Sequence, residues 1–494
     1  MAKKKFYITT SIAYTNAPPH IGFALEVIQA DVLARYHRFL GEDVFFLTGT
    51  DEHGTKIAKA ACEAGKKPRE FVDDISKKFQ NLKTVLNLSN DDFIRTTDEK
   101  RHRPAVEKVW RKLKENNDIY KKKYRGLYCV GCESFISKKD LVDGKCPYHQ
   151  KEPEVIKEEN YFFKLSKYSK KIGKIIERDE IKIISKARKN EILSLIKQGI
   201  EDISCSRLKE RLLWGIPVPD DNSQTIYVWV EALINYISAL GYTEESDKFK
   251  KFWPADIHCI GKDIIKFHSL LWPAILISLD LELPKTIFIH GFITVGGQKM
   301  SKSLGTFIDP FELVKQYGAD AIRYFLLREI LPTEDGDFTY EKLEDRYNAD
   351  LAKGIGNLVS RVLTLAEKSG FKSESLKIKQ IQDSEFQTEI DKTWQKHNKA
   401  LNEFKFNTAL ISIWELIAFC DQYIEKEKLW EKKGQKEDIL YLLYTLENIA
   451  RMLKPFIPET SEKILCQLGI KSNDKEYVFN VEKKEPLFPK LNSK

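Results

Sequence analysis

The sequence predicts an α/β protein in which a parallel sheet is divided by an insertion and followed by an all-helical region. A strand at 5–12, a helix at 21–40 and a second buried strand at 43–48 follow one another, which is the order of a parallel α/β sheet. Short aromatic segments, turns and clustered cysteines replace this pattern between residues 116 and 221. From residue 351 onward, apolar residues recur at helical spacing. We therefore expect a split sheet domain followed by a helix bundle.

The rest of the chain continues both patterns. Buried apolar runs favour strands after the insertion, and long amphipathic runs favour helices near the C-terminus. The remaining predicted elements are strands at 225–230, 257–260 and 286–290, helices at 268–279, 401–424 and 439–453, a helical stretch up to residue 114, and a loop at 372–383.

Composition places the chain among ordinary globular proteins. Its 494 residues are 42% hydrophobic and 31% charged, which is enough to bury a core in about three domains. The net charge of +8 permits nucleic acid as a partner without requiring it. Residues 1–5 are basic, but no apolar signal segment follows and no apolar run is long enough to cross a membrane. We therefore expect a cytoplasmic protein.

A Pro-Pro-His turn separates the first strand from the first helix. Residues 17–23 read APPHIGF, which places His20 at the start of the helix. A helix N-terminus presents unpaired N–H groups and the positive end of the helix dipole, which suit a phosphate. Gly22 allows a ligand to approach the backbone closely, and His20 can donate to a phosphate oxygen. Alone, such a turn is more often structural.

A second motif, GGQKMSKSLG, occupies residues 296–305. Lys299 and Lys302 lie three residues apart among glycine and serine, which is typical of a mobile, positively charged loop. Such a loop can close over a polyphosphate and neutralise charge on its leaving group, although a lone motif of this kind is usually a solvated loop. Both motifs fall at strand ends of the split α/β domain, where such sheets bind ligands.

Three of the eight cysteines cluster with a histidine inside the insertion. Cys129 and Cys132 form one pair, and Cys146 and His149 follow after thirteen intervening residues. This spacing and donor set suit tetrahedral Zn²⁺. Because protein ligands would fill all four positions, the pattern predicts one structural zinc ion per chain rather than a catalytic one.

Together the two phosphate-binding motifs resemble those of the class I aminoacyl-tRNA synthetases, whose signatures read His-Ile-Gly-His and Lys-Met-Ser-Lys-Ser. The second signature is complete at 299–303, whereas Phe23 replaces the last histidine of the first. In the family that histidine helps to hold the phosphates of ATP, and Phe23 cannot donate a hydrogen bond. The resemblance implies a Rossmann-like catalytic domain that activates an amino acid with ATP.

Within this class, the chain is similar over nearly its whole length to the methionyl-tRNA synthetases. The segments that carry this resemblance are YTN at 14–16, TGTDEHG at 48–54, YCVGCE at 128–133, WGIPVP at 214–219, YVWVEAL at 227–233, GKDI at 261–264 and FH at 267–268. The regions it implies are a Rossmann-like catalytic domain in two halves at 1–115 and 222–290, a connective insertion with a zinc knuckle at 116–221, a KMSKS loop and stem-contact region at 291–350, and an α-helical anticodon-binding domain at 351–494.

The resemblance also implies roles for individual residues. His20, Lys299 and Lys302 are expected to assist catalysis by neutralising phosphate charge, with Mg²⁺ accompanying ATP. The further ATP contacts expected are Gly22, Glu231, Gly261, Lys262, Asp263, Met300, Ser301 and Ser303. The residues expected to form the methionine pocket are Ile12, Tyr14, Asp51, Arg207, Trp229, Ala232, Leu233, Tyr236, Ile264 and His268. The expected anticodon contacts are Asn357, Arg361 and Trp430.

These residue types fit those roles. A buried ammonium needs a carboxylate, which Asp51 supplies, and Arg207 stands where the family contacts the carboxylate side. Aromatic side chains suit a polarisable thioether. Asn357 and Arg361 lie four residues apart on one helix face and can read a base edge and grip a phosphate, while Trp430 can stack on an unpaired base.

The resulting expectation is a monomeric, ATP-dependent methionine–tRNA ligase that forms methionyl-adenylate and then charges the 3′-terminal adenosine of tRNA(Met). Another class I synthetase is one alternative. The cysteine enzyme is nearest in size but places zinc in its active site, and the enzymes for leucine, isoleucine and valine carry a longer insertion than 116–221. A synthetase-like RNA-binding module without catalysis is the other alternative; Phe23 agrees with it, whereas the intact lysine loop at 299–303 does not.

Overall fold

The structure is a computed structural model in which most of the chain can be described. The described residues are 3–129, 134–136, 141–147, 150–299, 306–371, 373–377, 379, 382, 384–432, 434–472 and 476–491. They form two compact units. The first unit comprises residues 1–19, 37–83 and 89–290, and the second comprises 20–36, 84–88 and 291–494.

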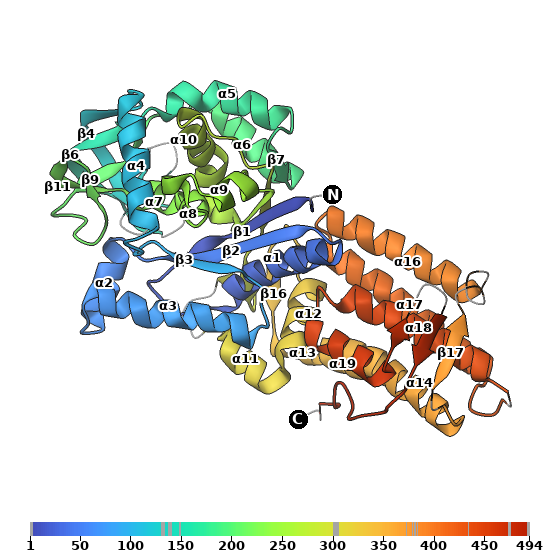
Figure 1. The fold of residues 1–494 in the computed structure, drawn as a ribbon. Helices are drawn as coiled ribbons and strands as arrows, with labels where there is room; N and C mark the ends of the chain where they lie inside the picture. Colours follow the sequence, from blue (N-terminus) through green and yellow to red (C-terminus); the bar gives the residue numbers. More distant parts are fainter. Residues whose placement is uncertain are drawn as a thin grey trace. The chain divides into compact units, whose positions relative to one another are not determined.

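A six-stranded parallel sheet lies at the centre of the first unit (Figure 1). Its strands, in spatial order, are β3 (Asp92–Arg95), β2 (Asp43–Asp51), β1 (Lys5–Tyr14), β12 (Ile257–Gly261), β13 (Thr286–His290) and β7 (Lys182–Ile184). The inner strands are buried along most of their length, which explains their continuous apolar sequences. Strand order runs outward in both directions from β1 and β12. The topological switch of this doubly wound sheet therefore lies between these two strands.

Helices surround this sheet, and several bury an apolar face in the core that they share with it. The helices of the first unit are α2 (Thr55–Glu63), α3 (Pro68–Val85), α4 (His102–Glu115), α5 (Leu165–Glu177), α6 (Lys186–Gln198), α7 (Val228–Leu233), α8 (Asn235–Ser238), α9 (Asp247–Phe252) and α10 (Trp272–Ser278). In α4, for example, Ala105, Val109 and Leu113 recur at a spacing of four and join the main core. Short turns at Lys262–Ile264 (3₁₀) and Phe267–Leu271 (π) follow β12.

The segment between α4 and α7 adds two small sheets. One contains β5 (Ser134–Ile136), β4 (Ile119–Cys129), β6 (Glu154–Phe163) and β8 (Ile203–Ser204). The other contains β10 (Pro217–Val218), β11 (Asp221–Ile226) and β9 (Ser206–Leu208). The same segment returns to the main sheet, since β7 pairs in parallel with β13. The predicted domain boundaries stay predictions.

The second unit is mainly helical. Helix α1 (Ile21–Phe39) belongs to this unit as far as Tyr36. The other helices are α11 (Pro310–Tyr317), α12 (Ala319–Glu329), α13 (Tyr340–Arg346), α14 (Asn357–Lys368), α16 (Glu385–Asn402), α17 (Phe406–Lys426), α18 (Lys436–Leu453) and α19 (Pro458–Leu468), with a π-helical stretch at Tyr347–Gly356. Its strands are β14 (Ile293–Val295), β15 (Gln298–Lys299), β16 (Gly336–Phe338), β17 (Glu374–Lys377), β18 (Lys471–Ser472) and β19 (Glu476–Phe479).

A buried guanidinium holds three parts of the second unit together. Arg323 of α12 pairs with Asp31 of α1 at 2.8 Å, and neither side chain is exposed. Arg323 also donates to the backbone carbonyl oxygens of Pro455 at 2.9 Å and Phe456 at 2.6 Å, directly after α18. A buried ion pair of this kind is stable only when further hydrogen bonds satisfy it.

The strands and helices expected at the N-terminus are confirmed as β1, α1 and β2, and the strands expected at 257–260 and 286–290 as β12 and β13. The helices at 401–424 and 439–453 are found as α17 and α18, each with shifted ends. Where 268–279 was expected to be one helix, a π turn at Phe267–Leu271 leads into α10. No helix in the described residues is long and apolar enough to cross a membrane.

Three predictions of secondary structure were wrong. The strand expected at 225–230 ends as β11 at Ile226 and becomes α7, because an apolar run of this length fits a buried helix equally well. The helical stretch before residue 114 contains β3, which is only four residues long. The region after 351 is not all-helical, since β17 pairs with β19 about a hundred residues later and occupies part of the expected loop at 372–383.

Candidate active site

The carboxyl ends of β1 and β2 bring several predicted pocket residues together. In the parallel register, Tyr14 pairs with Asp51, and Ile12 pairs with Gly49. Gly49 is required by a close approach, because a Cβ atom there would lie 2.1 Å from the carbonyl oxygen of Ile94 and 3.0 Å from Ile12. This end of the sheet lies beside the topological switch, where ligands bind in doubly wound folds.

A buried hydrogen bond joins two further pocket residues from different elements. The hydroxyl of Tyr236 in α8 lies 2.7 Å from Nε2 of His268 in the π turn. The other ring nitrogen, Nδ1, lies 3.1 Å from the carbonyl oxygen of Ile264, which can only accept. His268 therefore carries its proton on Nδ1 and accepts from Tyr236. Burial lowers the pKa of His268 to about 4, so the imidazole is neutral near pH 7.

A second buried histidine, His258, packs against this pair. The ring of His258 on β12 lies 4.2 Å from the ring of Tyr236. Nε2 of His258 accepts from the indole N–H of Trp272 at 3.3 Å, so Nδ1 donates to the hydroxyl of Thr9 at 2.7 Å. Burial holds the pKa of His258 well below its usual range. The residues that orient Tyr236 and His268 are thus themselves fixed by hydrogen bonds.

Aromatic side chains occupy the start of α7 and the π turn. The rings of Trp229 and Phe267 stack with centroids 4.2 Å apart and an interplanar angle of 6°, and both side chains are half-buried. Ala232 and Leu233 of α7 are buried, and Ile264 packs against the same core. Flat aromatic surface of this kind contacts a thioether favourably.

The acidic residues at the end of β2, Asp51 and Glu52, are buried and differ in their partners. Glu52 is held by the guanidinium of Arg95 at 2.7 and 2.9 Å and by the hydroxyls of Thr50 and Thr97. The neighbouring Asp51 is 4% exposed and lies 3.5 Å from the hydroxyl of Thr96, beyond a strong hydrogen bond. The bidentate pair at Glu52 fixes the backbone that presents Asp51.

Glu231 and Arg207 are both buried in contacts within the first unit. The carboxylate of Glu231 has no exposure and lies 2.6 Å from Nδ1 of His53. The guanidinium of Arg207 donates to the hydroxyl of Ser204 at 2.8 Å and to the carbonyl oxygen of Ser206 at 2.7 Å. An ATP contact by Glu231 and a methionine contact by Arg207 stay predictions.

Sequence reasoning missed the supporting residues of this site. His53 and Glu52 belong to the TGTDEHG segment, yet only Asp51 was assigned a role there. His258 and Arg95 lie outside every quoted motif. The only sequence signal for His258 and Arg95 was a charged or imidazole side chain within an otherwise apolar strand, as His258 is in the IHCIG sequence of β12.

His20 directly precedes α1 in the second unit, and Gly22 lies in the first turn of this helix. The backbone N–H of Gly22 donates to Nδ1 of His20 at 3.0 Å, so the neutral ring carries its proton on Nε2 and can donate from there. Burial lowers the pKa of His20. The ring of Phe307 contacts it edge to face at 6.3 Å. His20 is therefore oriented as a neutral hydrogen-bond donor at a helix N-terminus.

The lysine loop starts from a small hairpin in the second unit. Lys299 on β15 pairs with Thr294 on β14. Gly296 and Gly297 form the turn between these strands, with φ of 59° and 74°, a conformation that favours glycine. The carboxylate of Asp337 accepts from the N–H of Gly297 at 2.8 Å, which holds the turn. The other predicted loop residues, Met300, Ser301, Lys302 and Ser303, lie outside the described residues.

After β12 the chain presents the remaining predicted ATP contacts. Gly261 is the last residue of the strand and is buried, Lys262 is half-buried, and Asp263 is exposed. A Cβ atom at Gly261 would lie 2.9 Å from the carboxylate oxygen of Asp263, which folds back over the strand end. The ligand contacts expected of these three residues stay predictions.

Half of the predicted zinc site can be described. The thiols of Cys129, at the end of β4, and Cys146 are both buried in the same insertion. Cys132 and His149 lie outside the described residues. No group of three or more potential metal ligands comes together among the residues that the structure describes. Two buried thiols suit zinc as donors, and the four-ligand site stays a prediction.

The predicted anticodon residues lie on α14 and just beyond α17. The guanidinium of Arg361 pairs with Asp421 at 3.0 Å and Glu425 at 2.6 Å, both on α17. Trp430 is 49% exposed, and its indole N–H donates to Glu431 at 3.0 Å. The anticodon contacts expected of Asn357, Arg361 and Trp430 stay predictions.

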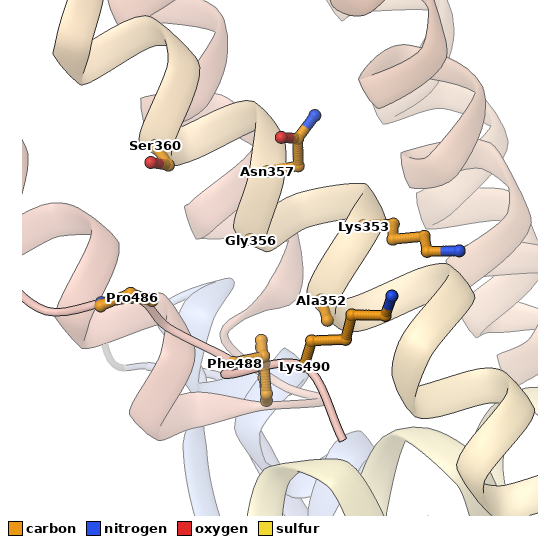
Figure 2. A pocket seen from close by; sticks show the side chains of 8 residues that line it. All are labelled: Ala352, Lys353, Gly356, Asn357, Ser360, Pro486, Phe488 and Lys490. Atoms are coloured by element: carbon orange, nitrogen blue, oxygen red, sulfur yellow. The ribbon is translucent and has the colours of Figure 1, made fainter. Parts of the chain in front are cut away.

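Asn357 lines an open pocket of about 510 Å³ on this helix. Figure 2 shows that helical residues form one side and that the C-terminal segment forms the other. The lining residues are Ala352, Lys353, Gly356, Asn357, Ser360, Pro486, Phe488 and Lys490. Lysine, serine and asparagine side chains beside an aromatic ring can contact a nucleotide.

Comparison with known proteins defines the class. A family model described as "tRNA synthetases class I (M)" matches residues 6–154 and 138–363, and one described as "Anticodon-binding domain of tRNA ligase" matches 383–491. The fold and its motifs are therefore those of a class I tRNA synthetase followed by an anticodon-binding domain.

Individual relatives identify the family within this class. The Methionine--tRNA ligase of Thermotoga maritima is 43% identical over 511 residues, covering 99% of this chain and 81% of the relative. That of Rickettsia felis is 42% identical over 483 residues, covering 96% and 94%. A solved structure of Mycobacterium tuberculosis methionyl-tRNA synthetase in complex with methionyl-adenylate is 35% identical, covers 98% of this chain and 100% of its own, and has a TM-score of 0.91. The chain belongs to the methionyl-tRNA synthetase family.

Proposed function

We propose that this chain activates methionine with ATP and transfers it to tRNA(Met). The observation that carries the proposal is the buried, hydrogen-bonded pair of Tyr236 and His268, which is held in one protonation state beside the stacked rings of Trp229 and Phe267. These residue types suit an unbranched thioether, and the buried Asp51 suits its ammonium. Membership of the family, and the methionyl-adenylate held by the M. tuberculosis relative, support the same substrate.

In the first step, a carboxylate oxygen of methionine attacks the α-phosphorus of ATP, a P–O bond forms, and the bond to pyrophosphate breaks. Nucleophile and leaving group are both anionic, so positioning and charge neutralisation supply the catalysis. We assign the phosphate contacts to His20, through its Nε2 proton, and to Lys299 and Lys302. Mg²⁺ bound to ATP supplies further neutralisation when present.

In the second step, the 2′-hydroxyl of the terminal adenosine attacks the carbonyl carbon of the adenylate, its proton is released, and AMP leaves. The enzyme forms no covalent intermediate in this scheme. We assign Asn357, Arg361 and Trp430 to the anticodon, where an exposed aromatic ring and a guanidinium can stack on and grip unpaired nucleotides.

Zinc, oligomeric state and location complete the proposal. Cys129, Cys132, Cys146 and His149 would hold one zinc ion that stabilises the insertion and takes no part in the reaction. Metal analysis of the purified chain should find one zinc per chain, and Cys146→Ser should lose it; a folded preparation with well under one zinc would overturn the assignment. We further propose that the chain acts as a monomer in the cytoplasm.

Amino-acid-dependent exchange of pyrophosphate into ATP, run with all twenty amino acids and without tRNA, tests adenylation directly. Exchange with methionine alone is the expected result. Exchange with a different amino acid would keep the class and discard methionine as the substrate. The absence of exchange from folded, zinc-loaded chain would discard the proposed reaction, and restoration by Phe23→His would then trace the loss to that residue.

A further inference from the structure

Positive charge is concentrated in one short part of the first unit. Residues 164–198, which contain α5, β7 and α6, hold eleven lysine and arginine residues against four acidic ones, a net charge of +7. The whole chain has a net charge of only +8. Neither proposed step of the reaction uses this segment, and no motif that carries the family resemblance falls in it.

The cations of α5 lie on one face of the helix. Lys167, Lys171, Lys174 and Arg178 are spaced three or four residues apart, Lys170 is adjacent to Lys171 on the same side, and all five are exposed. We call them the lysine face. The buried residues of the same helix are Leu165, Tyr168, Ile172, Gly173, Ile175 and Ile176. Because these residues belong to the opposite side of the helix, the lysine face points to solvent.

Packing on α6, on α10 and on the π turn at Phe267–Leu271 fixes this helix in place (Figure 1). A Cβ atom at Gly173 would lie 3.4 Å from the side chain of Ile196, so the two helices approach closely. At its N-terminus, the hydroxyl of Ser166 donates to Asp202 at 2.6 Å. A helix held on two sides cannot rotate to bury its charges, so the lysine face is a permanent surface of the unit.

Most of the lysine face is not neutralised by the protein. Lys167 is committed to the buried carboxylate of Asp118 at 2.6 Å, and Arg178 reaches Glu180 at 3.8 Å. Among the described residues, no carboxylate lies within 4.0 Å of Lys170, Lys171 or Lys174. These three ammonium groups follow one another over about one helical turn, roughly 6 Å of the axis. Unpaired like charges this close raise the local potential and attract anions.

The chemistry of this face suits a polyanion rather than a single anion or a membrane. Compact, strongly hydrated lysine heads on an open helix surface bind repeated phosphates as point charges, without the fork geometry that selects one group. The large hydrophobic side chains that are exposed elsewhere in the described chain, such as Leu213 and Trp430, do not occur in 164–198. A membrane-surface helix would need such residues beside its charges.

We propose that the lysine face of α5 binds the phosphate backbone of tRNA. This inference rests on the proposed function, which makes tRNA the polyanion that the chain must hold. The contact is sequence-independent, so it strengthens the complex with any tRNA without contributing to the choice of amino acid or anticodon.

Charge reversal of two unpaired lysines tests this inference against a matched control. The test variant is Lys170→Glu/Lys174→Glu. The control is Lys77→Glu/Lys78→Glu on α3, which makes the same charge change at two exposed positions of a helix with four basic and three acidic residues. The probe is tRNA(Met) transcript, and its dissociation constant is measured from about 50 to about 200 mM salt.

The test variant should bind tRNA about tenfold more weakly at about 50 mM salt, and the slope of log affinity against log salt should fall by about 1.5, because each lost phosphate contact removes about 0.7–0.9. The control should keep the wild-type slope. A tRNA with a different anticodon should show the same change in slope. Lys170→Gln/Lys174→Gln loses the same two contacts, so it should lower the slope equally but weaken binding less than the charge reversal does.

Equal slopes for the test variant, the control and the wild type would overturn the inference. So would a normal tRNA slope accompanied by loss of binding to phosphatidylserine vesicles, which would assign the face to membranes. Pyrophosphate exchange without tRNA should be unchanged in the test variant, which also shows that it is folded. Absence of exchange from wild-type protein would count against the proposed function alone, because the tRNA slopes are measured independently of it.

Discussion

The buried polar cluster around Tyr236 and the charged groups on α14 and α17, which we propose to serve methionine and the anticodon, are held by their partners in opposite ways. Around Tyr236, His268 and His258, each ring nitrogen has one partner, and its tautomer is fixed. On α14 and α17, by contrast, Arg361 is held by Asp421 and Glu425 at a surface where these carboxylates can be exchanged for phosphates.

The difference follows from the surroundings of each group. Inside the protein a polar atom that loses its partner remains desolvated, so each buried contact is costly to remove. At the surface, water replaces a lost partner, and an ion pair contributes about 0–1 kcal/mol. A rigid interior therefore suits a small substrate that must be recognised by shape, whereas replaceable surface pairs suit a large polyanion.

The largest expected effect on the free energy of unfolding concerns Arg95, which pairs with a buried carboxylate. Arg95→Met leaves the unexposed carboxylate of Glu52 without its bidentate partner, and we expect a loss of about 3–5 kcal/mol in the free energy of unfolding. Arg101→Met is the matched control, because Arg101 also binds two carboxylates, Asp92 and Asp98, but is 41% exposed. It should lose less than about 1 kcal/mol. Urea unfolding measures both, and equal losses would contradict the comparison.

Acid should weaken the buried cluster through His268. The pKa of His268 is about 4 in the folded chain because burial disfavours the imidazolium, whereas an unfolded histidine titrates near 6.5. The unfolded state takes up the proton first, so stability present above pH 6.5 is lost as the pH falls toward 4, by up to about 1.4 kcal/mol per pH unit.

His268→Gln should remove this contribution. Its free energy of unfolding should therefore fall by about 1 kcal/mol less than that of the wild type between about pH 6.5 and 5.5. Tyr236→Phe is the control, since it leaves His268 buried and should keep the wild-type pH dependence. The same pH dependence in wild type and His268→Gln would show that another group is responsible.

The hydroxyl of Tyr236 tests the buried cluster through its effect on methionine binding. Tyr236→Phe removes one buried hydrogen bond to His268 and should raise the KM for methionine by roughly three- to tenfold, in line with about 0.5–1.5 kcal/mol per hydrogen bond. The KM for ATP should not change. Tyr242→Phe makes the same chemical change at a buried ring that packs on Phe249, and pyrophosphate exchange should leave it unaltered. Equal effects of both variants on methionine would contradict the assignment.

The same contrast explains how much the sequence could predict. Strand β1 and helix α1 were predictable because their apolar residues repeat with a local period. Partners of buried groups are not local: Glu231 meets His53 across 178 positions, and no pattern along the chain shows that its carboxylate is covered. Strand β3 is too short to have a period of its own, and only pairing with β2 makes it a strand.

The smallest expected effect concerns the surface ion pairs of Arg361. Asp421→Asn/Glu425→Gln should free the guanidinium for RNA and raise the affinity for tRNA about two- to fivefold at low salt, while stability changes by less than about 1 kcal/mol. Glu415→Gln on the same helix is the control, because it frees Lys396 instead. If the control raised affinity equally, removal of any negative charge would be sufficient. If neither changed it while Arg361→Ala did, the two carboxylates would position Arg361 rather than compete for it.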